Sequence, residues 1–289
     1  MKLSIVTSTY NRIDLLSRLI ESLQHQSDKK FEWILIDDGS TDSTKEHIKS
    51  ISEQFDFDFK YRYQNNSGKH VALNRGFNEA NGDYLIILDS DDLLSTDAVD
   101  KILKAFDDIK KDNDIGVISF CNQTLEQLPI GNQLSGFTCS QLDYIYKYKG
   151  TGDRSEVFKK TIYKEFRFPI FDNERFCPEA LVWNRIGLKY KTKYVSDVIK
   201  YVEYQSDGLT SKIIQIRAES PNSTLLYYRE LFYCAIPSKD KFKACINFWR
   251  FSCHSKFKVL NKNLDAITGY DIVSIPFGFM FFLKDKYLK

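Results

Sequence analysis

Three acidic residues follow directly on a run of four apolar residues in the first half of the chain. The run Leu85–Leu88 predicts a buried strand, and Asp89, Asp91 and Asp92 come immediately after it. Clustered carboxylates repel one another and are costly to desolvate, so packing does not explain them. A divalent cation removes that cost, and hard carboxylate oxygens suit Mg²⁺ or Mn²⁺. We therefore predict a metal site in which Asp89 and Asp91, which point the same way in an extended Asp-x-Asp segment, share one ion.

A solvated turn, with Asp91 or Asp92 capping the next helix, is the alternative, and two further strand ends argue against it. The predicted strand 31–36 runs into DDGSTD, and the predicted strand 3–8 runs into TYNR. Helical patterns follow both strands: apolar residues in 13–23 share one face, and the sequence STKE at 43–46 fits a capping box. Strands that alternate with helices over short connections predict a mainly parallel sheet, which binds ligands beyond the carboxyl ends of its strands.

The segments SIVTSTYNR, ILIDDGSTD and GKHVALNRGFNEANGDYLIILDSDD, in this order and spacing, resemble family-2 glycosyltransferases. The resemblance is strong over residues 1–120 and traceable to about residue 235. It implies an inverting enzyme with the A-type (GT-A) fold, an α/β, Rossmann-like domain with a mixed, mainly parallel sheet flanked by helices. A C-terminal helical extension would follow. Physical argument by itself reaches only a metal-dependent, anionic ligand at this sheet edge.

The chain is expected to have three parts. Residues 1–120 would be the nucleotide-sugar-binding half, residues 121–238 the acceptor-binding half of the same catalytic domain, and residues 239–289 a basic, aromatic, helical tail. Tyrosines 144, 146 and 148 fit either a sugar pocket or an edge strand. Further helices are predicted at about 96–110, 177–188, 222–235 and 241–253, strands at 115–120 and 193–205, and a loop at 206–210.

The resemblance assigns the nucleotide base to the first two loops. The backbone near Thr7 and the side chain of Tyr10 would flank a uracil ring, and Asp38 would accept a hydrogen bond from its ring N–H. Asp37 would support the loop. The alternative for Asp38 is a plain turn residue before Gly39.

The diphosphate and the metal are assigned, again by resemblance, to the later segments. Lys69 and Arg75 would offset the diphosphate charge or bridge to the carboxylates, unless they lie on a solvated helix face. Asp91 would contact the metal directly, and Asp89 would reach the ribose or bind the metal through water. The Mn²⁺ or Mg²⁺ ion would neutralise the leaving nucleoside diphosphate as a Lewis acid. Asp92 would orient the loop or cap the next helix.

Inversion requires a carboxylate that takes the proton of the acceptor hydroxyl. Family members carry this base at the start of a helix in the acceptor half, usually within a Glu-Asp pair, and residues 176–183 read FCPEALVW. The resemblance thus implies Glu179 as the catalytic base, although the second acid is missing. A first-turn glutamate favoured by the helix dipole is the alternative. Asp153 is the other candidate, as base or as an acceptor-binding residue.

Composition limits the location and the cysteine chemistry. Charged residues make up 28% and hydrophobic residues 43% of the 289 residues, as in ordinary soluble proteins. No apolar run approaches the about 20 residues that span a bilayer. The first strand follows directly on residues 1–2, so we expect no signal peptide and a cytoplasmic protein. The six cysteines are then expected to be free thiols, since Cys245, Cys253 and His254 lack a fourth ligand for zinc.

The tail differs from the rest of the chain in charge. Residues 239–289 hold ten Lys/Arg and four Asp/Glu, a net charge of +6, so residues 1–238 carry −4. The tail is also aromatic and apolar, which favours an anionic membrane surface over nucleic acid. We therefore expect a peripheral location at the inner face of the cell membrane and no nucleic-acid partner. The alternative is that segments 241–258 and 274–289 pack back on the catalytic domain as ordinary amphipathic helices.

These expectations combine into one function. The protein would be a metal-dependent, inverting glycosyltransferase that moves a sugar from a nucleotide-sugar donor, most simply a UDP-sugar, to a saccharide acceptor. The acceptor would be lipid-linked, in the biosynthesis of a polysaccharide such as O-antigen or capsule. A sugar-nucleotide nucleotidyltransferase would share the sheet, but it needs a glycine-rich basic loop, and residues 7–12 contain no glycine. A non-enzymatic membrane-surface adaptor would explain the tail but not the carboxylate clusters.

Overall fold

The computed structural model describes residues 2–203, 212–255 and 268–287, so the predicted loop at 206–210 lies outside the described residues. The chain divides into two compact units. Unit 1 comprises residues 1–167 and 186–204, and unit 2 comprises residues 168–185 and 205–289. These units do not coincide with the three parts predicted from the sequence.

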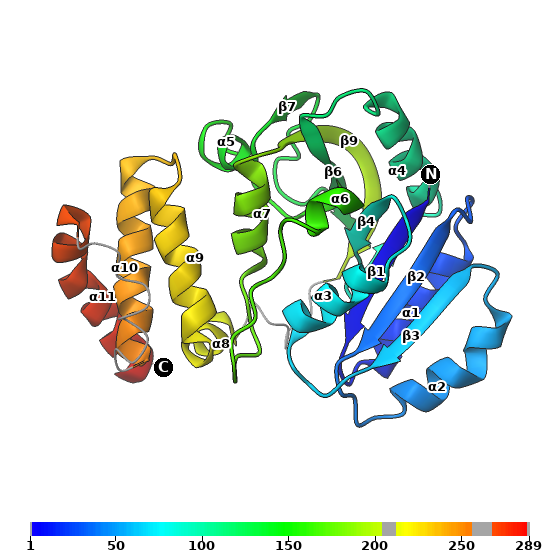
Figure 1. Cartoon of the computed structure of the whole chain (residues 1–289), viewed down its shortest axis with the longest axis horizontal. Coiled ribbons are helices and arrows are strands. Elements are labelled where there is room, and N and C mark those ends of the chain that lie inside the picture. Colours follow the sequence, from blue (N-terminus) through cyan, green and yellow to red (C-terminus); the bar gives the residue numbers. More distant parts are fainter. Residues whose placement is uncertain (1, 204–211, 256–267, 288–289) are drawn as a thin grey trace. The chain divides into compact units, whose positions relative to one another are not determined.

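Unit 1 is built on one mixed sheet, with nine strands among the described residues (Figure 1). The strands are β1 (Leu3–Thr9), β2 (Phe31–Asp37), β3 (Asp58–Tyr63), β4 (Tyr84–Ile87), β5 (Leu93–Leu94), β6 (Ile115–Thr124), β7 (Phe137–Cys139), β8 (Arg154–Lys159) and β9 (Lys191–Val202). Their order is β3-β2-β1-β4-β8-β6-β9-β5, and β7 pairs with β9. The neighbours from β3 to β4 are parallel, whereas β8 runs antiparallel to both β4 and β6.

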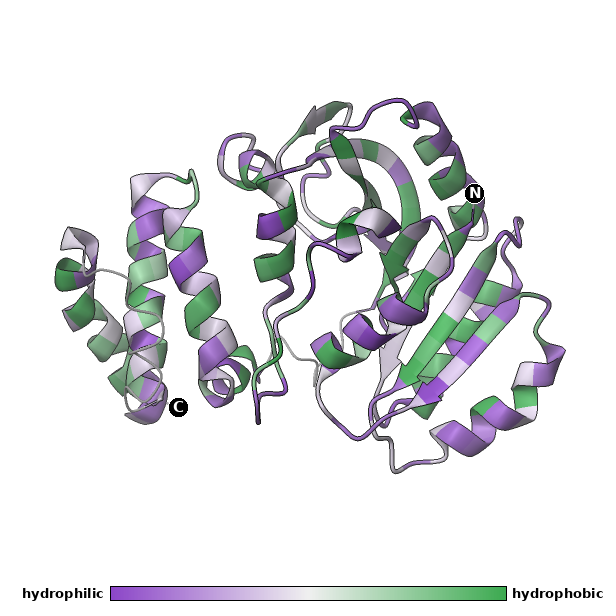
Figure 2. Ribbon diagram, viewed as in Figure 1, coloured by the Kyte–Doolittle hydropathy of each residue, from purple (hydrophilic) through white to green (hydrophobic). Residues whose placement is uncertain are grey.

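Helices cover both faces of this sheet (Figure 1). The helices of unit 1 are α1 (Ile13–Gln24), α2 (Thr44–Ile51), the 3-10 turn η1 (Ser52–Gln54), α3 (Lys69–Glu79), α4 (Ala98–Asp108), α5 (Gln141–Tyr146) and α6 (Lys160–Tyr163). Successive residues of a strand point to opposite faces, so each strand contributes to two layers. Strands β1 and β2 are hydrophobic over much of their length, as expected for strands that are buried on both sides (Figure 2).

The two faces are packed by different helices. Ile5 and Trp33 belong to one buried cluster with residues of α1 and α4, such as Leu16 and Phe106. On the other face α3 approaches β1 so closely that a Cβ at Gly76 would lie 2.3 Å from Val6 Cγ1. The glycine therefore permits the close helix–strand packing that places the start of α3 at the sheet edge.

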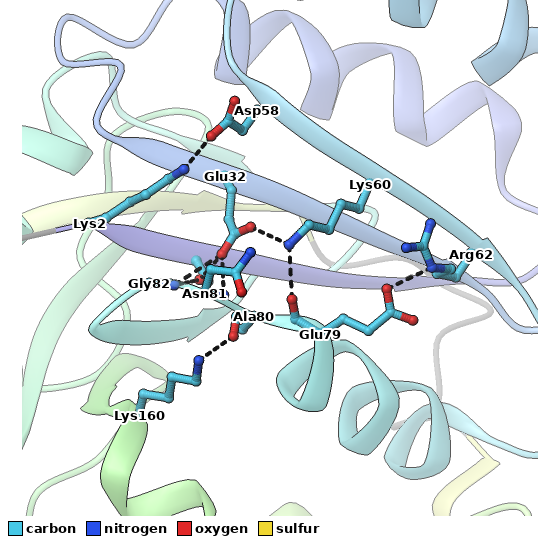
Figure 3. Close-up of polar contacts among 11 residues, drawn as sticks. Lys2, Glu32, Asp58, Lys60, Arg62, Glu79, Ala80, Asn81, Gly82 and Lys160 are labelled. Atoms are coloured by element: carbon cyan, nitrogen blue, oxygen red, sulfur yellow. Dashed lines mark hydrogen bonds and ion pairs between the residues drawn. The ribbon is translucent and has the colours of Figure 1, made fainter.

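The edge of the sheet where β1 and β2 begin, here called the amino edge, is closed by a buried carboxylate (Figure 3). Glu32 Oε1 accepts hydrogen bonds from Ser4 Oγ (2.7 Å) and from the backbone N–H groups of Asn81 (2.5 Å) and Gly82 (3.0 Å). Lys60 Nζ donates to Glu32 Oε2 at 2.7 Å. These contacts connect β1, β2, β3 and the turn before β4. They thereby fix where β4 begins relative to the neighbouring strands.

Unit 2 is helical. It contains α7 (Glu179–Gly187) up to Arg185, together with α8 (Ile213–Glu219), α9 (Pro221–Tyr233), α10 (Ser238–His254) and α11 (Gly269–Tyr287). Its core includes Leu225 of α9 and Phe248, Trp249 and Phe251 of α10. The described part of the first predicted tail segment, residues 241–255, therefore packs within this unit and is not an exposed anchor. Among the described residues, no helix combines the length and apolarity that a membrane crossing requires.

Most predicted elements are confirmed within two to three residues at each end, two details are wrong, and one open alternative is decided. Ser43 makes no capping bond to α2; instead Thr44 donates its backbone N–H and its hydroxyl to Asp42 Oδ1 at 3.1 and 2.6 Å. Of the two alternatives for the tyrosine segment, the edge strand is excluded for Tyr144 and Tyr146, which lie in helix α5, and Tyr144 stacks on Tyr194 with ring centroids 4.1 Å apart. The strand at 115–120 extends to residue 124.

Candidate functional site

The ends of β1, β2 and β4 lie side by side and form what we call the carboxyl edge. The parallel register pairs Thr9 with Asp37, and Val6 with Ile87. The loops that follow these strands, residues 10–12, 38–43 and 88–92, therefore leave the sheet at the same edge. The predicted convergence of the three polar clusters is confirmed.

Each carboxylate of the Asp-x-Asp pair contacts a cation from a different loop or helix. Lys69, the first residue of α3, places Nζ 2.7 Å from Asp89 Oδ1. Arg12, in the loop after β1, donates from Nη1 to Asp91 Oδ2 at 2.8 Å. The side chains of Asp89 and Asp91 are still 38% and 19% exposed. The pair is thus electrostatically balanced, yet a ligand from solvent can reach it.

The surrounding cations keep Asp89 ionised. Burial alone would raise the pKa of Asp89, but the charges of Lys69, Lys200 and Arg12 outweigh it and hold the pKa of this carboxyl below its ordinary value. A carboxylate with a lowered pKa is charged at neutral pH, as a metal ligand must be.

A buried ion pair lies directly behind this pair. Lys200, near the end of β9, places Nζ 2.6 Å from Asp92 Oδ2, and the two side chains are 10% and 6% exposed. Burial would lower the pKa of Lys200, but Asp92, Asp89 and Asp153 raise it above its ordinary value. Of the two roles predicted for Asp92, the cap of the next helix is excluded, because Asp97 precedes α4. Asp92 braces the acidic loop against β9.

The first two loops are fastened to each other by Asn11. Its Oδ1 accepts the backbone N–H of Thr41 at 2.7 Å, and its own N–H donates to Ser40 Oγ at 2.9 Å. Asn11 has a φ of 51°, a left-handed conformation that asparagine tolerates better than most residues. The same turn thereby directs the neighbouring Arg12 toward Asp91.

Asp38, the predicted uracil acceptor, already holds the loop before α3. It is buried, and its Oδ1 accepts from Gln64 Nε2 at 2.8 Å and from the N–H of Ser67 at 2.9 Å. Its Oδ2 accepts from the N–H of Gly68 at 2.8 Å. The contact with uracil stays a prediction. Asp37 supports its loop as predicted, by accepting the N–H of Ser40 at 2.8 Å.

The other two predicted base-binding residues differ in their availability. The side chain of Thr7 is buried and accepts a hydrogen bond from Trp33 Nε1 at 3.0 Å, so only its backbone is left for the predicted role. Tyr10 is 46% exposed at the carboxyl edge. An exposed aromatic ring at a ligand edge suits stacking, and this role for Tyr10 stays a prediction.

Of the two predicted cations, Lys69 and Arg75, only one lies at the Asp-x-Asp pair. Lys69 bridges to the Asp-x-Asp pair, which is one of the two predicted roles. Arg75 lies further along α3, donates from Nη1 to the carbonyl of Tyr63 at 2.8 Å and has Nε 3.7 Å from Glu79 Oε1. The structure therefore does not bring Arg75 to the carboxylates.

Asp153 lies at the carboxyl edge. It directly precedes β8, which runs antiparallel to β4 with Val157 opposite Ile86, and it is exposed. Three residues further along, in β8, Glu156 accepts a hydrogen bond from Ser119 Oγ at 3.3 Å. Burial, followed by the charge of Asp153, raises the pKa of Glu156 to about 7, although Arg154 and Lys200 oppose the shift.

Glu179, the predicted base, is the first residue of α7 and belongs to unit 2. The second acid of the expected pair is missing here too. The nearby Glu174 is buried and accepts the N–H groups of Asn222 and Ser223 at 2.5 and 2.9 Å, so it holds the start of α9. Glu179 therefore stays the predicted base of this segment.

Sequence reasoning missed four residues of the edge: Asn11, Arg12, Glu156 and Lys200. Arg12 had a usable signal, because it follows the first strand and a cation there lies at the same edge as the carboxylates. Lys200 had none, because it stands 108 residues from Asp92 within an ordinary strand pattern.

The donor atoms at this edge fit a divalent cation that arrives with a phosphate ligand. Asp89 and Asp91 offer hard oxygen donors, and no group of three or more His, Cys, Asp or Glu side chains suited to a metal occurs in the described part of the chain. Mg²⁺ commonly binds proteins through one or two carboxylates, with substrate phosphates and water filling the other positions. The site therefore resembles a half-site that a diphosphate would complete.

Comparisons with known proteins agree on one family. A model described as "Glycosyl transferase family 2" matches residues 4–173. The GalNAc(5)-diNAcBac-PP-undecaprenol beta-1,3-glucosyltransferase of Campylobacter jejuni is 27% identical over 286 aligned residues, covering 92% of this chain and 85% of that protein. Several other curated relatives match only 36 to 37% of this chain, which in turn spans 15 to 33% of their length.

Solved structures share the fold. Staphylococcus aureus TarS 1-349 in complex with UDP-GlcNAc gives a TM-score of 0.62 at 16% identity, covering 98% of this chain and 81% of that one. The mannosyltransferase PcManGT of Pyrobaculum calidifontis, in complex with GDP-Man and Mn²⁺, gives 0.56 at 15% identity, covering 100% and 88%. At such identities the likeness concerns the fold alone, and it confirms the predicted GT-A fold.

Proposed function

Because the chain belongs to glycosyltransferase family 2, we propose that it transfers a sugar from a UDP-sugar to a lipid-linked saccharide in polysaccharide biosynthesis. The observation that carries the proposal is the Asp89–Asp91 pair, which is partly exposed and held by two cations at the carboxyl edge. The Campylobacter relative is named for a glucosyl transfer to an undecaprenol-linked saccharide, which supports the acceptor class. The complexes with UDP-GlcNAc and with GDP-Man and Mn²⁺ support the donor class and the metal.

Asp91 and Asp89 would hold the Mn²⁺ or Mg²⁺ ion. When bound, such an ion acts as a Lewis acid that neutralises the leaving diphosphate. Lys69 and Arg12 pair with the two carboxylates. Both side chains are long and about 30% exposed, so they can turn from the carboxylates to phosphate oxygens when the donor enters. Lys200 and Asp92 keep the acidic loop in place throughout.

Glu179 would take the proton from the acceptor hydroxyl. Glu179 is the first residue of α7, where the partial positive charge of a helix N-terminus interacts favourably with a carboxylate. Asp153 is the alternative, since it is exposed at the same edge of the sheet. The Glu179→Gln variant should lower turnover by on the order of 100-fold while the Kd for UDP is retained. A dead Asp153→Asn variant beside an active Glu179→Gln variant would reverse the assignment.

The donor site can be tested without knowledge of the acceptor. UDP release from UDP-glucose and UDP-GlcNAc would be measured with Mn²⁺, with Mg²⁺ and after EDTA treatment. The Asp91→Asn variant should lose on the order of 100-fold in rate. Asp107, an exposed residue of α4, supplies the matched control Asp107→Asn, which should keep the full rate. Metal-independent release, or an active Asp91→Asn variant, would overturn the metal site; GDP-mannose as the preferred donor would overturn only the choice of UDP.

A further inference from the structure

Helix α11 turns several of its large apolar side chains away from the other helices of unit 2. Ile272, Val273, Phe279 and Met280 are 50 to 65% exposed. Its buried positions are small or acidic, namely Asp271, Ser274 and Gly278, and Phe281 and Phe282 are half-buried against Arg250 and His254 of α10. An ordinary surface helix shows the opposite distribution, with its apolar stripe toward the core. In Figure 2 this helix is coloured hydrophobic over much of its length.

The small residues allow close packing on α10. A Cβ at Gly278 would lie 2.6 Å from Trp249 Cβ and 2.9 Å from the carbonyl oxygen of Ile246, so the backbones are in contact at that point. A larger residue at position 278 would push the two helices apart. The orientation of α11 is therefore set by shape on its inner side.

Both acidic residues of α11 are neutralised on this inner side. Asp271 accepts from Trp249 Nε1 at 3.1 Å and lies 3.4 Å from Arg229 Nη1. Asp285 accepts from Arg250 Nε at 2.6 Å and pairs with His254 Nε2 at 3.0 Å. These buried polar contacts stabilise the same orientation of α11 as the close contact at Gly278. In that orientation the apolar face points outward.

The outward face is continuous and carries only positive charge. Residues spaced by three, four or seven positions share it along the whole helix, which is about 28 Å long for 19 residues. Lys284 and Lys286 stand on either side of its C-terminal end and are exposed. The apolar members are Ile272, Val273, Ile275, Pro276, Phe279, Met280, Leu283 and Tyr287.

We propose that this face of α11 docks in the plane of an anionic lipid surface. An apolar face of this length is unfavourable in water, and flanking lysines with inward-turned acids match the charge of anionic headgroups. The proposal deepens the proposed function, on which it rests for its biological setting, by naming the surface that meets the membrane carrying the acceptor. It differs from the sequence-based expectation, which assigned the whole segment 239–289 to the membrane.

Vesicle binding by the full chain tests the proposal. Co-sedimentation with vesicles of phosphatidylcholine plus phosphatidylglycerol should be strong at low salt, and weaker with phosphatidylcholine alone or at high salt. The Phe279→Ser/Met280→Ser variant should lower the partition coefficient by at least about tenfold. The control Leu128→Ser/Leu188→Ser, at two exposed leucines of unit 1, should not change it. The Lys284→Gln/Lys286→Gln variant should lower only the anionic component, by about tenfold.

Two further measurements keep the outcomes distinct. Phe279→Trp should shift its fluorescence to the blue on addition of anionic vesicles, which requires no destabilising change. UDP release from UDP-GlcNAc in the absence of vesicles should be equal in all these variants, so a failure of the proposed transferase activity cannot be mistaken for a failure of docking. Wild-type protein that ignores anionic vesicles would overturn the proposal. So would a dimer that the Phe279→Ser/Met280→Ser variant splits, because a second copy would then be the occupant.

Discussion

The amino edge and the carboxyl edge of the same sheet hold their carboxylates in different ways. Glu32, at the amino edge, is 1% exposed and accepts four hydrogen bonds, two of them from backbone N–H groups (Figure 3). Asp89 and Asp91, at the carboxyl edge, are partly exposed and are held by the long side chains of Lys69 and Arg12. At the amino edge, backbone and buried side-chain groups occupy the carboxylate oxygens. At the carboxyl edge, the carboxylates are paired only with long side chains that a ligand can displace.

The difference separates structural from ligand-binding carboxylates. Burial would raise the pKa of Glu32, but Lys60, Ser4 and the N–H of Asn81 lower it below its ordinary value. A ligand could bind Glu32 only by displacing backbone groups, which would open the fold. At Asp89 and Asp91 a ligand needs to displace only side chains. We therefore expect changes at the two edges to have opposite consequences.

The largest expected loss of unfolding free energy comes from a substitution at the amino edge. The Glu32→Gln variant should lose about 3 kcal/mol of unfolding free energy, because glutamine cannot neutralise the largely buried Lys60. UDP release per folded molecule should stay unchanged. The Asp91→Asn variant should show the reverse, with no loss of unfolding free energy, since removal of one carboxylate relieves repulsion in the cluster. Urea unfolding and the UDP-release assay measure both quantities.

Glu79 provides the control for this pair of variants. It pairs with Arg62 near the same edge, but the two side chains are 25% and 44% exposed. The Glu79→Gln variant should therefore change the unfolding free energy by less than about 1 kcal/mol. If Glu32→Gln were as mild as Glu79→Gln, the distinction between the two edges would fail.

A smaller loss is expected behind the carboxyl edge. The Lys200→Met variant should lose about 2 kcal/mol, because Asp92 is left buried without its partner while the methionine chain regains some apolar packing. Adding Asp92→Asn should restore part of that loss, and a double-mutant cycle measures the coupling. The exposed Lys191, 3.5 Å from Asp114, supplies the control Lys191→Met. If the losses of unfolding free energy from the two substitutions simply added, the proposed stabilising contact between Lys200 and Asp92 would be contradicted.

The role of Asp38 can be sharpened by a still smaller effect. The Asp38→Asn variant should lose about 1 kcal/mol of unfolding free energy, since it weakens the acceptor for the N–H groups of Ser67 and Gly68. If Asp38 mainly holds this loop, the Kd values for UDP and GDP should rise by the same factor. Weaker UDP binding with unchanged GDP binding would instead support the predicted contact with uracil. Isothermal titration in Mn²⁺ separates the two outcomes.

A further expected effect is a pH dependence at Glu156. The folded protein holds this proton up to a pKa of about 7, whereas the unfolded chain releases it near 4.5. Rising pH therefore favours the unfolded state between those values, and stability falls across that window. The Glu156→Gln variant should gain in Tm relative to the wild type as the pH rises from 4.5 to 7. The exposed Glu53 provides the control Glu53→Gln, whose difference from the wild type should stay constant.

Local pattern determined much of this protein. Runs of apolar residues with periods of two and 3.6 predicted β1, β2, β4, α1, α4, α9 and α10, because that periodicity is a property of neighbouring residues along the chain. The same pattern located Asp89 and Asp91 at the end of a buried strand. The fold class and the polar edge followed, since parallel strands connected by helices end on one side.

Only the tertiary structure decided which cations pair with the carboxylates. Arg12 stands 79 residues from Asp91 and Lys200 stands 108 residues from Asp92, and their pairing depends on the order of strands in the sheet, which no local pattern encodes. The same applies to α11: its composition indicated an apolar helix, but the contact at Gly278 and the pairing of Asp285 decided which face turns outward. Sequence spacing determines which residues share a face, whereas packing determines what that face meets.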